Sequence, residues 1–184
     1  MLFFKNYSSL DDDHLMLLIA DEDHRAFREL LERHQGSVHG FAFRFLGDAH
    51  EAADVAQETF LRIFTNAATY TPGTSFRAWA MRIARNLCLD YVRKKKPLLV
   101  EQLPEQPDHD TPMHAAIRQE TADALAQAVR RLPESQRTAL ILRHNEGLRY
   151  DEIAMAMDVT VSAVESLLVR ARKALRSVLS PLSA

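Results

Sequence analysis

The 184-residue sequence has little cysteine, little glycine and no long apolar run. Its single cysteine, Cys88, excludes an internal disulfide, so a reducing cytosol is the simplest interpretation. Five glycines are few, which disfavours sheets joined by tight turns. No apolar run approaches the length of about 18 residues that a transmembrane helix needs, so we expect no membrane insertion. The N-terminus is too short and too acidic for a signal peptide, and we expect a cytoplasmic protein.

Neither sign of charge dominates the whole chain, but positive charge is concentrated in two segments. The net charge is −2, and the apolar content of 47% is ample for a core. Residues 77–96 nevertheless hold seven Lys or Arg against one acid, a local charge of +6, and residues 161–184 hold four against one. Basic islands in acidic surroundings indicate dedicated polyanion sites.

Helical periodicity runs through most of the chain, and we expect an all-α fold. The spacing predicts helices over residues 11–20, 24–46 and 49–67. Gly36 and Gly40 weaken the second of these, so we expect an interruption near its middle. Farther along, we expect a helix that begins at Thr111-Pro112 and runs to about residue 131. The spacing then predicts three more helices, over 133–144, 150–157 and 162–179.

The segment Ser75–Lys96 predicts a basic amphipathic helix with Ser75 as its N-cap. Its apolar stripe consists of Phe76, Trp79, Ala80, Ile83, Ala84, Leu87 and Tyr91. Phe76 and Trp79 are possible stacking platforms for bases, but their place on the stripe favours core packing. Cys88, at the edge of the stripe, is expected to be a packed thiol.

Composition changes after Pro97. Residues 97–112 contain four prolines, four acids and no base, which is typical of a flexible linker. We therefore expect two small helical domains, residues 10–96 and 114–184, joined by a linker over 97–113. Its seventeen residues would reach roughly 56 Å when extended, whereas one DNA turn is about 34–36 Å.

The last two helices have the spacing of a helix-turn-helix. Ala154 allows a close approach of the second helix, Asp158 tolerates a left-handed turn, and Val164 supplies the apolar contact. We expect Ser162 to cap the second helix. An ordinary helical hairpin in a bundle remains the alternative for this segment alone.

Three strings in this order resemble a bacterial sigma factor. They are DVAQETFLRIF (Asp54–Phe64), SFRAWAMRIARNLCLDYVRKK (Ser75–Lys95) and the long segment Leu132–Leu175. The similarity is to the small extracytoplasmic-function class (group IV) of the sigma-70 family, which keeps only the second and fourth sigma regions. It covers roughly residues 10–180 and implies that 10–96 is region 2 and 114–184 is region 4.

The resemblance implies that the helix around Asp54–Phe64 docks on core RNA polymerase. The implied surface consists of Asp54, Gln57, Glu58, Leu61 and Arg62. Helical periodicity leaves the same residues outward, because Ala52, Val55, Ala56, Phe60 and Ile63 form the apolar face. A merely solvated face would explain the charges but not an exposed Leu61.

The resemblance also implies that the loop 68–75 captures an unstacked base of the −10 promoter element, while the following helix holds the separated strand. The implied −10 contacts are Tyr70, Arg77, Arg82, Arg85, Asn86, Arg93, Lys94 and Lys95.

In the same family the helix-turn-helix reads the −35 element. The implied contacts are Ser162, Glu165, Ser166, Val169, Arg170 and Lys173. The sequence departs from the family at Glu165 and Leu167, where basic residues are usual, and at Arg149, where a capping Ser is common. Since Glu165 repels phosphate but accepts from a cytosine amine, we expect an unusual −35 sequence.

No cofactor, metal or catalysis is expected. His34 and His39 are five residues apart and diverge on a helix, and no phosphate-binding glycine loop or nucleophile elbow occurs. The expected function is transcription initiation with core RNA polymerase on promoter DNA, regulated by an anti-sigma factor, often membrane-attached, in a stress response. Two alternatives remain: a stand-alone helix-turn-helix regulator, and a sigma-mimic decoy that binds an anti-sigma factor but not DNA.

Overall fold

The computed structural model describes residues 6–95 and 124–179, and within these two stretches every regular element is helical. The predicted all-α fold class is confirmed. The predicted linker over 97–113 and the predicted helix start at Thr111-Pro112 lie outside the described residues.

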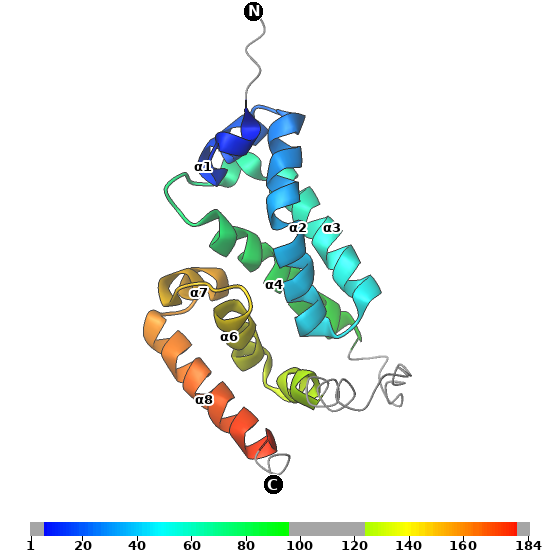
Figure 1. Cartoon of the computed structure of the whole chain (residues 1–184), viewed down its shortest axis with the longest axis vertical. Coiled ribbons are helices and arrows are strands. Elements are labelled where there is room, and N and C mark those ends of the chain that lie inside the picture. Colours follow the sequence, from blue (N-terminus) through cyan, green and yellow to red (C-terminus); the bar gives the residue numbers. More distant parts are fainter. Residues whose placement is uncertain (1–5, 96–123, 180–184) are drawn as a thin grey trace, which may run out of the picture.

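Four α-helices build the first domain, described over residues 6–95 (Figure 1). They are α1 (Asp12–Ala20), α2 (His24–Leu46), α3 (Ala49–Thr65) and α4 (Phe76–Lys95), with short 3-10 turns η1 (Tyr7–Ser9) and η2 (Ala67–Thr69). The expected interruption of α2 does not occur, and the helix runs unbroken through Gly36 and Gly40. Tertiary packing of its buried Val38, Phe41 and Phe45 overrides the weak helix propensity of glycine.

Helix α4 is covered on two sides. It packs on α2 and α3, as its apolar stripe predicts, and also on α7 of the second domain. Consequently Ala78 and Met81, which lie outside the predicted stripe, are buried as well. Cys88 is fully buried, as expected, and burial raises the pKa of its thiol to about 12. Ser75 is the N-cap, since the backbone N–H of Ala78 donates to its Oγ at 3.3 Å.

The second domain comprises a helical segment over residues 124–131 followed by α6 (Glu134–His144), α7 (Tyr150–Met157) and α8 (Val161–Leu179). Asp158 adopts the left-handed conformation, with φ of 58°, in the turn between α7 and α8, and Val164 is fully buried. The expected cap at Ser162 is wrong. The helix begins one residue earlier, and the Oγ1 of Thr160 accepts from the backbone N–H of Ala163 at 3.1 Å.

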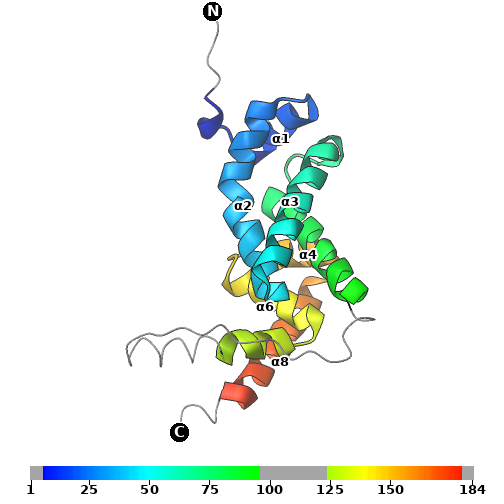
Figure 2. The same ribbon diagram turned by 90° about the vertical axis from the view of Figure 1, so that its right-hand side faces the viewer.

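The two domains lie against each other, with α6, α7 and α8 grouped below the four-helix domain (Figures 1 and 2). One buried apolar cluster runs through both, and it includes Phe41 and Met81 from the first domain and Leu142 and Ile153 from the second. Along the described stretches no helix is both long and apolar enough to cross a membrane.

Candidate nucleic-acid and partner interfaces

The outer face of α3 carries the side chains predicted to contact a protein partner. Asp54, Gln57, Leu61 and Arg62 are exposed, and Glu58 is half-buried. Glu58 accepts a hydrogen bond from the Nε of Arg62 at 2.8 Å, one helical turn away. Leu61 is 55% exposed and is one of several large apolar side chains that lie at the surface of the described residues.

A groove of about 880 Å³ lies between α2 and α3 and borders this face. Phe27 and Leu31 from α2 line one side of it, and Gln57, Leu61 and Phe64 from α3 line the other. Sequence reasoning misses the groove, because helical spacing places Phe27 and Leu31 on the same apolar face as the buried Leu30, whereas the structure leaves both half-buried. An apolar groove rimmed by polar side chains is suited to a protein partner.

The loop between η2 and α4 is exposed from Thr71 to Thr74, but Tyr70 at its start is only 7% exposed. The Tyr70 ring packs edge-on against Trp79, with centroids 5.4 Å apart, and against Phe76 at 6.1 Å. Tyr70 was predicted as a DNA contact, and this position instead makes its ring part of the core that supports the loop. The core assignment of Phe76 is confirmed, since it is buried.

The N-terminal half of α4 turns its arginines toward the second domain. The Nη2 of Arg77 donates to the main-chain carbonyl of Glu146, and Arg82 lies 3.8 Å from the Asp158 carboxylate. Arg85 is half-buried, and this burial lowers the pKa of its guanidinium. Three predicted −10 contacts therefore lie at the contact between the two domains.

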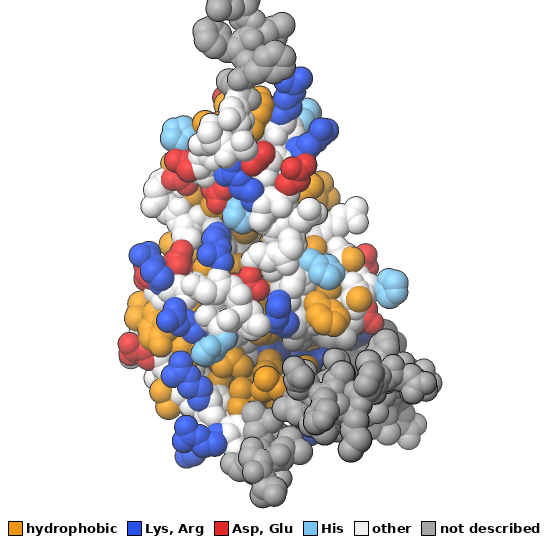
Figure 3. All heavy atoms as spheres, viewed as in Figure 1, with side chains coloured by type: hydrophobic (Ala, Val, Ile, Leu, Met, Phe, Trp, Pro, Cys, Tyr) orange, Lys and Arg blue, Asp and Glu red, His pale blue; other side chains and the backbone are white. Residues whose placement is uncertain are grey.

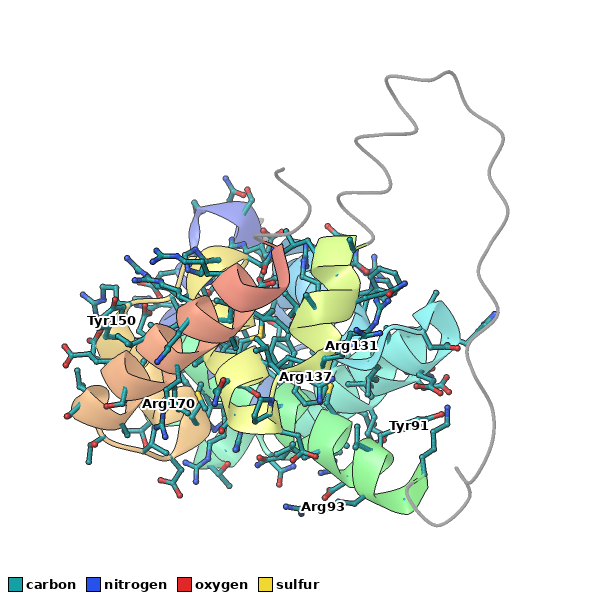
Figure 4. All side chains as sticks on the ribbon, turned by 90° about the horizontal axis from the view of Figure 1, so that it is seen from below. Tyr91, Arg93, Arg131, Arg137, Tyr150 and Arg170 are labelled. Carbon is teal, nitrogen blue, oxygen red and sulfur yellow. The ribbon has the colours of Figure 1, made fainter. Side chains whose placement is uncertain are left out.

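The C-terminal half of α4 points away from that contact. Asn86, Arg93, Lys94 and Lys95 are exposed. Arg93 lies 3.7 Å from Asp90, and the ammonium of Lys95 pairs with Glu51. Figure 4 shows Tyr91 and Arg93 at this end of α4, remote from Arg170 on α8.

Arg137 of α6 lies between the domains (Figure 4). Its guanidinium donates to the main-chain carbonyl of Phe45 at 2.9 Å and covers the Phe45 ring.

Glu146, in the turn between α6 and α7, is clamped by side chains from the first domain. It is only 8% exposed, and its carboxylate accepts from the Ser37 hydroxyl and lies 3.7 Å from the guanidinium of Arg44. A nearly buried carboxylate requires such partners, because desolvation of an unpaired charge is costly. A further contact joins the domains at Ser75, whose hydroxyl donates to Glu152 at 2.7 Å.

The outer face of α8 is exposed, with none of the other described helices packed on it. Its predicted −35 side chains share one exposed face, and they are Ser162, Glu165, Ser166, Val169, Arg170 and Lys173. Val169, in the middle of this face, is 63% exposed. Lys and Arg side chains run down the side of the molecule that α8 occupies (Figure 3). Leu167, the other departure at this helix, is buried and therefore does not face DNA.

Comparison with known proteins gives a consistent family. The chain matches the profile described as Sigma-70 region 2 over residues 30–97 and the one described as Sigma-70, region 4 over residues 122–175. It is 34% identical to the RNA polymerase sigma-H factor of Pseudomonas aeruginosa, a match covering 93% of this chain and 95% of that relative. It is 30% identical to the ECF RNA polymerase sigma factor SigW of Bacillus subtilis, covering 87% and 92%.

Two solved structures have a similar fold. CnrH, in complex with the cytosolic domain of CnrY, superposes with a TM-score of 0.74 at 27% identity, covering 92% of this chain and 97% of CnrH. The sigma factor RpoE, in complex with the anti-sigma factor NepR from Bartonella quintana, gives 0.68 at 21% identity, covering 84% and 96%. At that identity the second likeness concerns the fold alone.

Proposed function

This chain belongs to the extracytoplasmic-function sigma factors of the sigma-70 family, and we propose that three of its surfaces divide the work of promoter-specific initiation. The outer face of α3 binds core RNA polymerase. The loop 68–75 and α4 capture and hold the −10 strand, and α8 reads the −35 element in the major groove. The chain carries out no chemistry itself, and it works in the cytoplasm, where polymerase and promoters are.

The observation that carries this proposal is the exposed Leu61 beside the groove between α2 and α3. Leu61 continues the apolar lining that Phe27, Leu31 and Phe64 give the groove, so it belongs to one apolar surface and is not a single scattered leucine. A central apolar anchor with a polar rim is the usual composition of a protein–protein contact.

In our proposal the −10 strand binds more tightly when the two domains separate. The guanidinium groups of Arg77 and Arg82 are exposed, but each also contacts the second domain, and these contacts compete with phosphate. A partner shifts such an equilibrium only if it binds the open form more tightly. Core polymerase is that partner in our proposal, so the free chain holds the −10 strand weakly.

An anti-sigma factor is the expected negative regulator, and it acts by favouring the closed arrangement. CnrH, which is 27% identical and similar in fold, is in complex with a protein partner, the cytosolic domain of CnrY. A partner that spans both domains of this chain would preserve the contacts of Arg77 and Arg82 and thereby keep these side chains from DNA. Attachment of that regulator to a membrane is part of the same proposal.

The decoy alternative loses one of its two supports. It rested on Glu165 and Leu167 in place of basic residues, but Leu167 belongs to the core. The remaining departure, Glu165, is exposed on α8 among Arg170 and Lys173, so the face retains basic side chains for phosphate.

The test is in vitro transcription by core polymerase with and without this chain, on a fragmented library of its own genome. We expect discrete start sites that depend on the chain, and they will supply the promoter sequence. No transcripts, with the same core active on a control sigma factor, would reject the proposal.

A pair of matched variants tests the polymerase surface. We expect Leu61→Asp to weaken binding to core polymerase by about tenfold or more, because it places a charge at an apolar contact. Leu17→Asp is the control, since Leu17 is 53% exposed on α1 and does not line the groove. Equal affinities of the two variants, measured by fluorescence anisotropy with labelled chain, would contradict the assignment of α3.

A further inference from the structure

A carboxylate from α1 holds the loop that precedes α4. Asp13 lies in the first turn of α1, about sixty residues before the loop in the sequence. Its Oδ1 accepts from the hydroxyl of Tyr70, and its Oδ2 accepts from the backbone N–H of Gly73 at 2.7 Å. The Tyr70 hydroxyl also lies 2.9 Å from the carbonyl of Thr74. One side chain therefore fixes the start and the middle of the exposed stretch.

The loop between these two anchors is a tight turn. The backbone N–H and the hydroxyl of Thr74 both donate to the Thr71 carbonyl, at 3.3 and 2.7 Å. Pro72 follows Thr71, and Gly73 has φ of +86°, the arrangement of a type II turn. The Gly73 N–H, which points to Asp13, is thus presented by a backbone conformation that other residues rarely adopt.

The helix that carries Asp13 is itself held rigidly. The neighbouring Asp12 pairs with Arg33 at 3.3 Å and with His34 at 2.9 Å, both on α2. Leu15 and Met16 are buried directly after it. The two adjacent aspartates therefore have different tasks: Asp12 ties α1 to α2, and Asp13 ties α1 to the loop.

We infer that Asp13 is a positioning residue for capture of the −10 base, acting through the loop 70–75. This inference rests on the proposed role of that loop. Unstacking a base costs a few kcal/mol, and a loop that must also be ordered at that moment binds less tightly than one already in place. A carboxylate near a nucleic-acid strand is otherwise unfavourable, but both Asp13 oxygens are occupied by donors from the protein.

Two substitutions separate geometry from charge. In Asp13→Asn the amide oxygen accepts from the Gly73 N–H, while its NH₂ donates to the Tyr70 oxygen, whose hydrogen then turns to the Thr74 carbonyl. Asn therefore keeps both connections without the charge. In Asp13→Ala both are lost, and the loop is held only by its own turn. Asp21→Ala, an exposed acid at the other end of α1, is the control.

The experiment measures open complexes of the holoenzyme on a promoter whose −10 non-template bases are replaced one at a time by an abasic site. For the wild type we expect a large loss of open complexes when the abasic site stands at the captured position. For Asp13→Ala we expect about a tenfold weaker open complex on the intact promoter and a correspondingly smaller loss at that position only. Asp13→Asn and Asp21→Ala should keep the wild-type profile. Tyr70→Phe, which loses one anchor, should lie between.

The outcomes are distinguishable. If Asp13→Ala binds core polymerase normally but keeps the wild-type profile of base dependence, the inference is wrong. An equal loss at every position for both Asp13→Ala and Tyr70→Phe would reduce Asp13 to a general stabilising role and also overturn it. If the wild type forms no chain-dependent open complexes at all, the proposed function fails, and the inference fails with it.

Discussion

The two DNA-binding helices of this protein present their basic side chains in different states. On α8, Arg170 and Lys173 are exposed on a face that no other element of the described residues covers. On α4, Arg77 and Arg82 are engaged by the second domain, and Arg85 is half-buried between the domains. The α8 face is thus ready for phosphate, whereas on α4 the domain contacts of Arg77 and Arg82 compete with phosphate, and Arg93, Lys94 and Lys95 are exposed at the far end of the helix.

The difference follows from how each helix is packed. Helix α8 is amphipathic in the ordinary sense, with Val164 and Leu168 buried and the basic side chains outside. Helix α4 is covered on two sides, so the arginines of its N-terminal half, Arg77, Arg82 and Arg85, share a surface with α7 and the turns beside it. Promoter recognition should then be asymmetric, with duplex −35 contacts available to the free chain and −10 contacts strengthened by opening.

The strongest way to break this comparison is to lock the domains together. Ser75→Cys with Glu152→Cys places two thiols where the native side chains meet at 2.7 Å. A short bis-methanethiosulfonate reagent should join them, and dithiothreitol should release them. We expect initiation to fall to the level of core polymerase alone, because the Arg77 and Arg82 contacts cannot open, while binding to duplex −35 DNA persists.

The native thiol does not interfere with the lock, because Cys88 is buried and burial raises the pKa of its thiol to about 12. The reduced double variant and each single cysteine serve as controls for the lost cap at Ser75. A locked chain that initiates as well as its reduced form would show that closure does not limit the −10 face.

A milder change should shift the same equilibrium in the opposite direction. Glu146→Ala removes the carboxylate that Ser37 and Arg44 hold. Leaving those two partners unsatisfied costs about 1–3 kcal/mol of the free energy that keeps the domains together. We expect the free chain to bind a single-stranded −10 oligonucleotide about tenfold more tightly, with a lower free energy of unfolding. The measurement is anisotropy of a labelled oligonucleotide, with α2-to-α8 fluorescence transfer as the readout of opening.

Asp151→Ala is the matched control, since Asp151 lies exposed on α7 and its ion pair is within its own domain, with Arg149 at 2.8 Å. If Glu146→Ala leaves both the oligonucleotide affinity and the fluorescence transfer at the level of this control, Glu146 is not a clamp. A larger effect on duplex −35 binding than on the single strand would also contradict the asymmetry.

Sequence periodicity is sufficient to predict the helices and the exposed face of α8. The left-handed Asp158, the buried Val164 and the exposed Leu61 follow from local rules of spacing and turn conformation. The Ser162 cap was wrong because Thr160 and Ser162 are both good caps, and only tertiary packing selects between them.

Contacts between residues distant in sequence were beyond local rules. Nothing near Glu146 indicates that Ser37, more than a hundred residues earlier, will hold it. Likewise the acidic run that contains Asp13 has a sufficient local explanation as helix-start charge, which conceals its bond to Gly73. Tyr70 was placed on the DNA surface because the resemblance fixes the loop but not which side chains of it turn inward.

The smallest expected difference between the domains concerns acid. Helices α1 and α3 begin at the aspartate caps Asp11 and Asp48, whereas α8 begins at Thr160, which does not titrate. The backbone N–H of His14 lowers the pKa of Asp11, and that of Glu51 lowers the pKa of Asp48. Since these folded pKa values are depressed, the stabilisation is present above the unfolded value near about 4 and is lost as pH falls through the folded values.

Amide hydrogen exchange at low pH tests this last contrast. Below pH of about 4 we expect exchange at the Glu51 N–H to accelerate by less than about tenfold beyond its intrinsic change, while the Ala163 N–H of α8 shows no such excess. Asp48→Asn keeps a cap that does not titrate, so it should remove the excess at Glu51. Equal acceleration at both amides in wild type and variant would mean that acid acts on the shared core, and that the caps do not distinguish the two domains.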